Sequence, residues 1–240
     1  MAKGDLCTMS FLKSLLSYAW PVTQWEGQGK YGPLKLVWEQ GLLVVNSNNA
    51  NQSYGNLHAI WQQVLDDANV AKRNPRSILL LGFGAGSSAH ILRKEIGLRA
   101  PIIGVDGDPA MLNLARTHFH VDRLKDLRII CSDALEFAGT HQEVHDLVLV
   151  DLCHELDLAP GVDGEPFIAN LRKCTASGGL LCFNTIVHNA ASGERSQRVS
   201  ELLRLHFDTV TEKLYQGVNR VLTASWTTPG ATVAARNDRG

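Results

Sequence analysis

Four successive predicted strands each end in glycine or aspartate, and this pattern constrains the fold more than any other feature of the chain. The strands are short apolar runs that alternate with helical patterns, at Ser77–Leu81, Pro101–Val105, Leu127–Cys131 and Leu147–Asp151. The residues at their carboxyl ends are Gly82, Asp106, Asp133 and Asp151. Such alternation predicts a parallel sheet covered by helices on both faces, and open α/β sheets bind ligands at the carboxyl ends of their strands.

The predicted α/β domain extends beyond these four strands. Helical patterns cover Ser88–Ile96, Pro109–Thr117 and Arg195–Leu205. Asp108 is placed to cap the second of these helices, since Pro109 stands at its first turn. Three more strands are predicted at Leu180–Asn184, Val210–Tyr215 and Val221–Trp226. The last two strands are expected to be antiparallel, which gives a mostly parallel seven-stranded sheet.

The chain before Asn74 is richer in Trp, Asn, Gln and Gly and predicts a different arrangement. It contains helical spacing over Met9–Tyr18, a β-hairpin of Leu34–Trp38 and Leu42–Val45, a polar loop over Asn46–Ser53, and an amphipathic helix around Trp61. We therefore predict three parts. Residues 1–74 form an N-terminal helix, hairpin and lead-in helix, residues 75–228 form the α/β domain, and residues 229–240 form a flexible tail.

Composition excludes several functional classes for this 240-residue chain. Lys and Arg total 23 against 24 Asp and Glu, so the near-neutral chain lacks the basic footprint of a nucleic-acid-binding protein. No apolar run approaches the roughly 20 residues that span a bilayer, and no signal peptide is expected. The 5 cysteines lack zinc-ribbon spacing and are expected to be reduced thiols, which favours a cytoplasmic location.

The turn after the first strand of the domain is rich in glycine. Gly82, Gly84 and Gly86 alternate with Phe83 and Ala85 and are followed by a helix. Glycines allow a tight turn and close approach of a ligand to the backbone, and a helix N-terminus favours anionic atoms. Such a turn also occurs for packing alone. Its spacing differs from the dinucleotide fingerprint, which argues against NAD.

Asp106 stands 20 residues after Gly86, where an acid hydrogen-bonds a ribose diol. A single acid at a strand end is commonly a helix cap or part of a solvated turn. Three such acids, Asp106, Asp133 and Asp151, follow one glycine turn here. Their shared position indicates a nucleoside-type ligand.

Three segments resemble the S-adenosylmethionine-binding fold of class I methyltransferases, and in particular its spermidine synthase-like (aminopropyltransferase) branch. They are Asp106–Met111, Ser132–Phe137 and Asp146–Asp151. The hairpin and the Gln52-Ser53-Tyr54 helix start resemble the N-terminal region of that branch. The resemblance covers roughly residues 30–226 and implies a Rossmann-like domain with a small N-terminal β-hairpin and helix region, as a homodimer.

The resemblance also implies roles for individual residues. Gly82, Gly84 and Gly86 would face the methionine part of S-adenosylmethionine, Asp106 the ribose hydroxyls and Asp133 the adenine amino group. Asp151 would lie beside the sulfonium and the acceptor, and Tyr54 over the pocket mouth. The implied cofactor-binding set is completed by Phe83, Ala85, Gly107 and Ala134.

Departures from the spermidine synthase pattern argue against a polyamine substrate. Ala85 replaces the acid that holds the donor's primary amine, and Tyr54-Gly55 replaces a Tyr-Gln pair. Where the branch has two acids for the diamine, this chain has only Asp151, with His154 in the second place. One lost charge-assisted hydrogen bond removes about 1.5–3 kcal/mol from such a pocket.

Asp151 and His154 are the candidate bases. Methyl transfer from a sulfonium is an in-line displacement, so the protein chiefly positions the reactants, and a carboxylate can accept the proton of an amine acceptor. His154 titrates near neutrality and is a second candidate. The alternative interpretations are that Asp151 caps its loop and that His154 is a surface residue.

The histidine pairs His118/His120 and His141/His145 could suggest a metal, but no carboxylate or thiolate completes a ligand set at suitable spacing. We therefore expect surface histidines and no metal. The expected function is S-adenosylmethionine-dependent methyl transfer to a small-molecule acceptor. Two alternatives stay open: aminopropyl transfer from decarboxylated S-adenosylmethionine, and a non-catalytic binding protein that keeps the fold.

Overall fold

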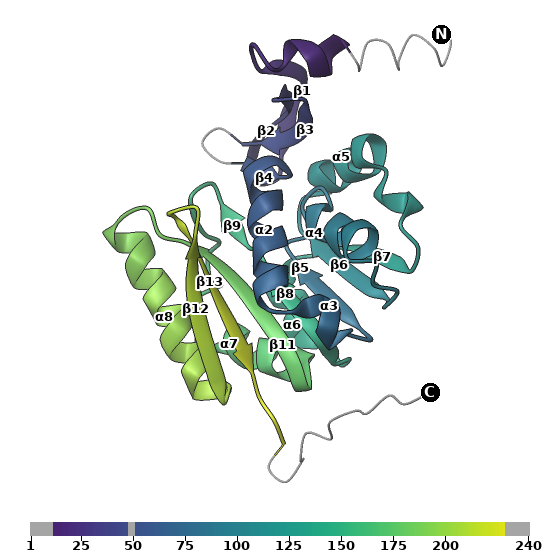
Figure 1. Ribbon diagram of the computed structural model, residues 1–240. Helices are drawn as coiled ribbons and strands as arrows, with labels where there is room; N and C mark the ends of the chain where they lie inside the picture. The colour runs from purple at the N-terminus through teal and green to yellow at the C-terminus, as the bar shows by residue number, and fades with distance from the viewer. Residues whose placement is uncertain (1–11, 48–50, 229–240) are drawn as a thin grey trace.

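A seven-stranded sheet forms the centre of the computed structural model, which describes residues 12–47 and 51–228 (Figure 1). Its strand order is β12-β13-β11-β8-β5-β6-β7. The strands are β5 (Ile78–Leu81), β6 (Ile102–Asp106), β7 (Leu127–Cys131), β8 (His145–Val150), β11 (Thr175–Ile186), β12 (Thr209–Tyr215) and β13 (Asn219–Ser225). Strands β5 to β8 and β11 pair in parallel, whereas β13 is antiparallel to both of its neighbours. The mostly parallel sheet expected from the sequence is confirmed.

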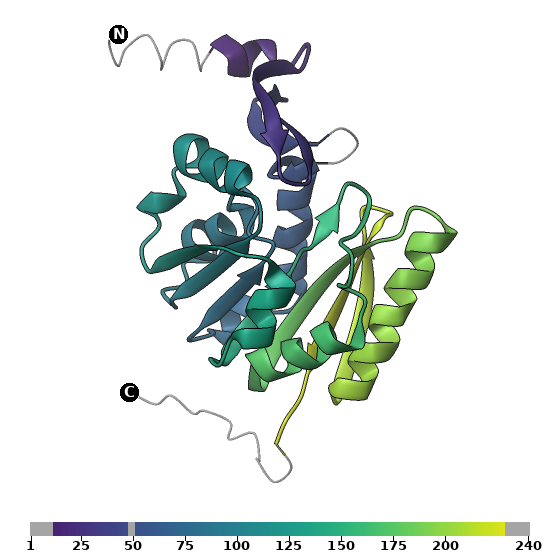
Figure 2. The same cartoon turned by 180° about the vertical axis from the view of Figure 1, so that it is seen from behind.

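Helices cover both faces of this sheet. One face packs against α2 (Gly55–Asp67), α4 (Ser87–His90), the π-helical turn η1 (Ile91–Glu95) and α5 (Pro109–Phe119), and the other against α6 (Ala134–Thr140), α7 (Glu165–Cys174) and α8 (Ala190–His206). Figure 2 shows the second face. The short elements α3 (Val70–Arg73) and η2 (Val121–Arg123) complete this part. In β5, alternate residues enter the two cores, so all four of its side chains are buried.

Strand order reverses between β5 and β8. From β5 the chain builds outward through β6 to β7, and it then returns to place β8 on the other side of β5. Crevices at such reversals are where open α/β sheets bind ligands, outside the carboxyl ends of the strands. The turn after β5 and Asp151 after β8 meet at this point.

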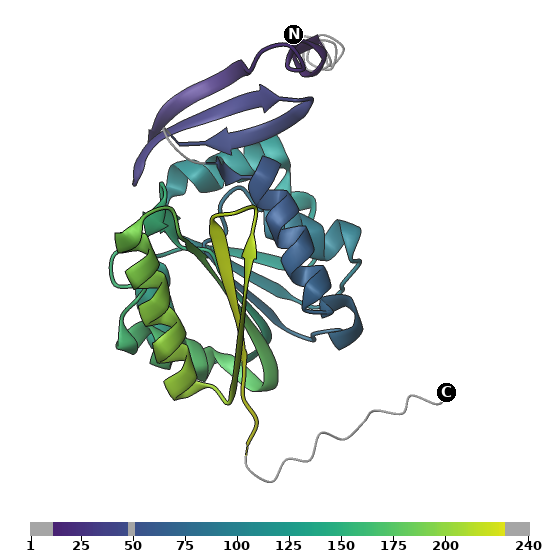
Figure 3. The same ribbon diagram turned by 60° about the vertical axis from the view of Figure 1, so that its left-hand side comes forward.

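A second sheet lies over the carboxyl ends of the large one (Figure 3). It consists of β1 (Val22–Gly29), β2 (Gly32–Glu39), β3 (Leu42–Asn46) and β4 (Asn51–Ser53), in that order and antiparallel. The sequence predicted only the central hairpin, β2 and β3. Leu34, Leu36 and Val45 of this sheet share a core with Ile78 and Leu80 of β5, across the predicted division near residue 74, and that division stays a prediction.

Several element boundaries differ from those expected. Residues 12–16 are helical, and the rest of the predicted N-terminal helix before them lies outside the described residues. The predicted helix Ser88–Ile96 is instead α4 followed by the π-helical turn η1. Helix α8 begins earlier than predicted, because Asn189 forms a capping box with Ser192.

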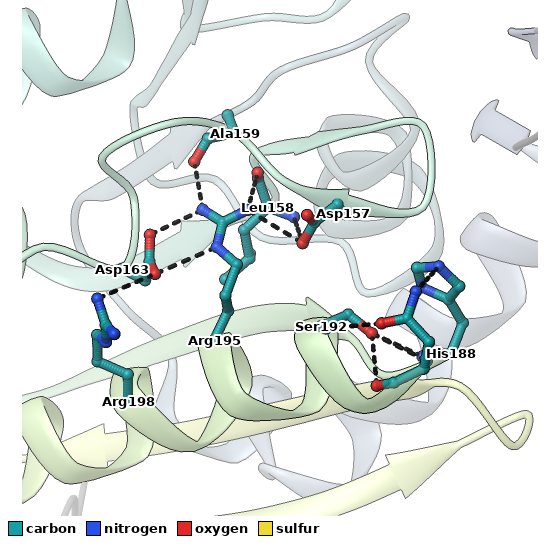
Figure 4. Close-up of polar contacts among 9 residues, drawn as sticks. Asp157, Leu158, Ala159, Asp163, His188, Ser192, Arg195 and Arg198 are labelled. Atoms are coloured by element: carbon teal, nitrogen blue, oxygen red, sulfur yellow. Dashed lines mark hydrogen bonds and ion pairs between the residues drawn. The ribbon is translucent and has the colours of Figure 1, made fainter.

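A loop with two short strands, β9 (Cys153–His154) and β10 (Asp157–Leu158), follows β8 and was not predicted. Arg195 of α8 holds this loop in place (Figure 4). Its guanidinium donates to the carbonyl oxygens of Leu158 at 2.6 Å and Ala159 at 3.0 Å, and it pairs with Asp163 at 2.7 Å. These contacts fix the loop in position, although it contains little regular secondary structure. Within the described ranges, no helix is long and apolar enough to cross a membrane.

Candidate active site

A cavity of about 630 Å³ opens between the large sheet and the small one. It is lined by the residues that follow β5, β6, β7 and β8, by the end of β11, by α2, and by the turn between β1 and β2. Its size falls within the roughly 300–1,000 Å³ range of small-molecule sites. Of the site residues predicted from the sequence, the structure brings nine to this cavity as lining: Gly82, Phe83, Gly84, Asp106, Gly107, Asp133, Ala134, Asp151 and His154.

The glycine turn needs its glycines for three different reasons. Gly82 has φ +86°, and a Cβ there would overlap the backbone carbonyl oxygen of Asp151. Gly84 (φ +56°) faces the cavity, where a Cβ would meet only atoms of Gln52 and Ser53 at 3.5 Å or more. Gly86 has φ +91°, and a Cβ there would press on Val121. Ala85 is fully buried, and neither Ala85 nor Gly86 lines the cavity. These two residues, which the resemblance placed in contact with the donor, instead pack behind the turn.

Asp106 is held by the backbone on both carboxylate oxygens. Gly84 N–H donates to Oδ2 at 2.7 Å and Asp108 N–H donates to Oδ1 at 2.9 Å. Burial raises the pKa of Asp106 to about 6, although these two hydrogen bonds act in the opposite direction. The carboxylate is therefore fixed in position at the cavity wall and can accept further hydrogen bonds from a ligand diol.

Asp133 combines a structural and a potential binding role. Its Oδ1 caps α6 by accepting from the backbone N–H of Leu135 at 2.8 Å and of Glu136 at 3.2 Å. The side chain is exposed, lines the cavity, and has no hydrogen bond to Oδ2 among the described residues. One oxygen thus stays available to a ligand while the other fixes the helix.

Asp151 lies at the centre of a polar network that the sequence did not reveal. Trp61 Nε1–H donates to its Oδ2 at 2.7 Å, and Asn184 Nδ2–H donates to its Oδ1 at 2.9 Å. Asn219 in turn donates to Asn184 Oδ1 at 3.1 Å. Burial raises the pKa of Asp151, against the effect of both hydrogen bonds. A partly buried carboxylate with a raised pKa is suited to take up a proton.

His154 lies at the cavity wall, as a candidate base requires, but in a different setting from Asp151. Its ring stacks on that of Tyr31, from the turn between β1 and β2, with centroids 4.2 Å apart. Burial lowers the pKa of His154. The stack joins the β9 strand to the small sheet across the cavity.

Tyr54 does not lie where the resemblance implied. Its ring stacks on Phe119 at 4.2 Å and meets His90 edge-on at 5.9 Å, and it is not part of the cavity lining. Its hydroxyl is buried without a hydrogen-bond partner, and burial raises its pKa. Tyr54 has φ +65°, and its side chain packs against the apolar core instead of lining the cavity.

The expectation of surface histidines is wrong for His145. It is 2% exposed, and its Nε2 lies 2.8 Å from Nε2 of His141, with Glu143 close enough for all three ligand atoms to lie within 4.8 Å. Burial lowers the pKa of His145 to about 4. A metal on Nε2 of His145 would leave the ring proton on Nδ1, which is buried without an acceptor. A hydrogen bond donated from Nε2 of His145 to His141 instead keeps the proton on Nε2, so this pair fits better than a metal site. This pair lies at the end of β8 opposite Asp151.

Comparison with known proteins agrees with this geometry. Residues 78–179 match the family described as Methyltransferase domain. A Drosophila melanogaster "eEF1A lysine and N-terminal methyltransferase homolog" is 22% identical over 156 residues, which cover 61% of this chain and 23% of that relative. The chain thus spans about a quarter of that relative's length.

Two solved structures share the fold. A probable spermidine synthase from Corynebacterium glutamicum superposes with TM-score 0.71 at 16% identity, covering 84% of this chain and 79% of that one. Human methyltransferase-like protein 13 in complex with SAH superposes with TM-score 0.58 at 19% identity, covering 76% and 86%.

Residues 78–179 therefore match the methyltransferase domain family, and the chain has the Rossmann-like α/β fold of the class I methyltransferase superfamily. The chain as a whole resembles the spermidine synthase-like branch of that superfamily.

Proposed function

We propose that this protein transfers a methyl group from S-adenosylmethionine to a small acceptor that carries one basic or nucleophilic atom. The donor supplies an electrophilic methyl group on a sulfonium. The residues that would hold the donor are Gly82 and Gly84, whose backbone lines the cavity, Asp106 by its carboxylate, and Asp133 by its unshared oxygen. The fit is supported by the cradle at Gly84, where a Cβ would narrow the cavity.

The observation that carries the proposal is the position of Asp151. It is two strands away from Asp106 in the sheet, because β5 lies between β8 and β6. Adjacent strands are about 4.8 Å apart, so roughly 10 Å separates the two strand ends. A carboxylate held by Trp61 and Asn184 at that point can orient an acceptor and take its proton.

The nature of the acceptor follows from the charges around Asp151. Both partners of its carboxylate, Trp61 and Asn184, are neutral, and His154 stands where a second acid would be needed for a diamine. The small sheet over the strand ends favours an acceptor that fits beneath it. A protein acceptor, suggested by the name of the Drosophila relative, is the alternative for this part of the proposal.

Aminopropyl transfer is the second candidate function. It is favoured by the similarity in fold to spermidine synthase structures. Ala85, fully buried in the glycine turn, offers no carboxylate for the amine of a decarboxylated donor. A non-catalytic binding protein is the third candidate, and it needs no proton acceptor at Asp151.

The test is calorimetry with S-adenosylmethionine and with its decarboxylated form, followed by product analysis with small amines, putrescine included. We expect the intact donor to bind at least as well as the decarboxylated one and little or no spermidine to form. Strong preference for the decarboxylated donor with robust spermidine formation would establish aminopropyl transfer. Binding without any transfer across an amine panel and a protein substrate would favour the binding protein.

Donor affinity should depend on pH through Asp106. The ionised carboxylate accepts hydrogen bonds from a diol, and protonation removes that capacity, so affinity falls as the pH drops through about 6. Between pH 7 and pH 5 we expect about a tenfold loss in the affinity for S-adenosylhomocysteine by calorimetry. Asp106→Asn should bind more weakly and lose this pH dependence. A pH dependence that persists in the variant would assign it to another group.

A further inference from the structure

Three side chains behind the glycine turn form a continuous hydrogen-bonded chain. Ser87 Oγ lies 2.7 Å from Nδ1 of His58, and Nε2 of His58 lies 2.8 Å from Oε1 of Glu95. Gln62 donates to the other oxygen of Glu95 at 2.6 Å. The three residues come from separate elements, α4, α2 and η1, so tertiary packing brings them together.

Only one member of this chain reaches the cavity. Ser87 is 4% exposed and lines the cavity, whereas His58 and Glu95 lie behind it and line no part of it. The stack of Tyr54 on His58, with centroids 5.6 Å apart, fixes the plane of the imidazole. Both oxygens of Glu95 are engaged, by His58 and by Gln62. The chain therefore ends in a single positioned hydroxyl.

The proton arrangement decides what that hydroxyl offers. When Nδ1 of His58 carries a proton, it donates to Ser87 Oγ, and the hydroxyl hydrogen is free to point into the cavity. In that state Nε2–H of His58 donates to Oε1 of Glu95 at 2.8 Å only if Nε2 is protonated as well. A neutral His58 that donates from Nε2 would instead accept the hydroxyl hydrogen of Ser87 at Nδ1, so a contact of Ser87 with an anionic oxygen requires protons on both nitrogens of His58.

We propose that Ser87 binds the carboxylate of the donor's amino-acid tail, with His58 and Glu95 as positioning residues. This inference rests on the proposed function. Of the described residues from β4 and α2 that line the cavity, none is acidic: Gln52, Ser53, Asn56, Leu57, Ile60 and Trp61. The wall beside Ser87 thus suits a carboxylate better than an ammonium group.

The test compares two ligands that differ only in that carboxylate, S-adenosylhomocysteine and its decarboxylated analogue S-adenosyl-3-thiopropylamine. In Ser87→Ala, affinity for S-adenosylhomocysteine should fall about 10- to 100-fold, the size of one charge-assisted hydrogen bond. Affinity for the decarboxylated analogue should change less than about threefold, because that ligand has no group for Ser87 to bind. Calorimetry measures both, so no turnover is needed.

A second variant guards against misfolding of the first. His58→Phe keeps a ring against Tyr54, removes both nitrogens, and touches no cavity wall. His58→Phe should also lower the affinity for S-adenosylhomocysteine and not for the decarboxylated analogue, by a smaller factor than Ser87→Ala. The matched control is Ser177→Ala, the same chemical change near the start of β11, at the end of that strand away from the cavity. Both affinities should be unchanged in this variant.

Each outcome decides between the two proposals. Equal losses for both ligands in the Ser87 and His58 variants, or no loss for either, would overturn the carboxylate contact and leave donor binding intact. Failure of both ligands to bind the unaltered protein would overturn the proposed function itself, and this inference with it.

Discussion

Asp151→Asn should lower methyl-transfer turnover by about 10²–10⁴-fold, the loss expected when a general base is removed. The near-isosteric change is not harmless to the network, however. Both carboxylate oxygens accept hydrogen bonds, from Trp61 and from Asn184, and an amide offers only one acceptor oxygen. We therefore also expect a loss of about 1–3 kcal/mol in the free energy of unfolding. Steady-state kinetics and urea denaturation measure the two effects.

A compensating variant separates catalysis from stability. In Asp151→Asn combined with Asn184→Asp, the new amide oxygen can accept from Trp61, and its NH₂ can donate to the new carboxylate. That carboxylate can still accept from Asn219, as Asn184 Oδ1 does now. The free energy of unfolding should largely recover, while turnover stays low because the carboxylate has moved to β11. If turnover recovers with stability, Asp151 serves the network and is not the proton acceptor.

Gly82→Ala should lower the free energy of unfolding by about 3–5 kcal/mol, a large loss for the addition of one methyl group. A Cβ at this residue would overlap the backbone carbonyl oxygen of Asp151, and φ is +86°. The obstacle is backbone, so no side-chain rotation can relieve it. Denaturant titration gives the change in the free energy of unfolding.

Gly97→Ala is the matched control for this substitution. Gly97 has nearly the same φ, +81°, and a Cβ there would meet no atom within 4 Å. It should cost only the left-handed backbone penalty of about 1–2 kcal/mol. Equal losses in the two variants would show that the contact with Asp151 is relieved by backbone movement and that Gly82 is needed for its φ alone.

The sheet and its ligand edge were predictable because they depend on local signals. Alternating strands and helices with Gly or Asp at each strand end predicted β5 to β8, and the Asp108-Pro109 pair predicted the start of α5. Asp106 and Asp151 reach the cavity for the same reason, since the carboxyl ends of parallel strands meet at one edge.

The partners of these acids were not predictable from local sequence. Trp61 follows the apolar spacing of α2, which indicates a core residue, and it is indeed 1% exposed; its indole N–H meets Asp151 only through packing. Asn184 reads as the last residue of a strand, and its amide becomes significant only beside β8. For Tyr54, neither the positive φ nor the packing of its ring against Phe119 leaves a pattern in the sequence.

The segment that matches the methyltransferase family includes Asp151 but not the three residues that form its hydrogen-bond network. Asp151 falls inside the matched segment 78–179, whereas Trp61, Asn184 and Asn219 all fall outside it. A relative that agrees with this chain over that segment can share the donor chemistry and yet surround the same carboxylate with other groups. Acceptor preference should therefore be transferred between such proteins only where α2, the end of β11 and β13 also agree.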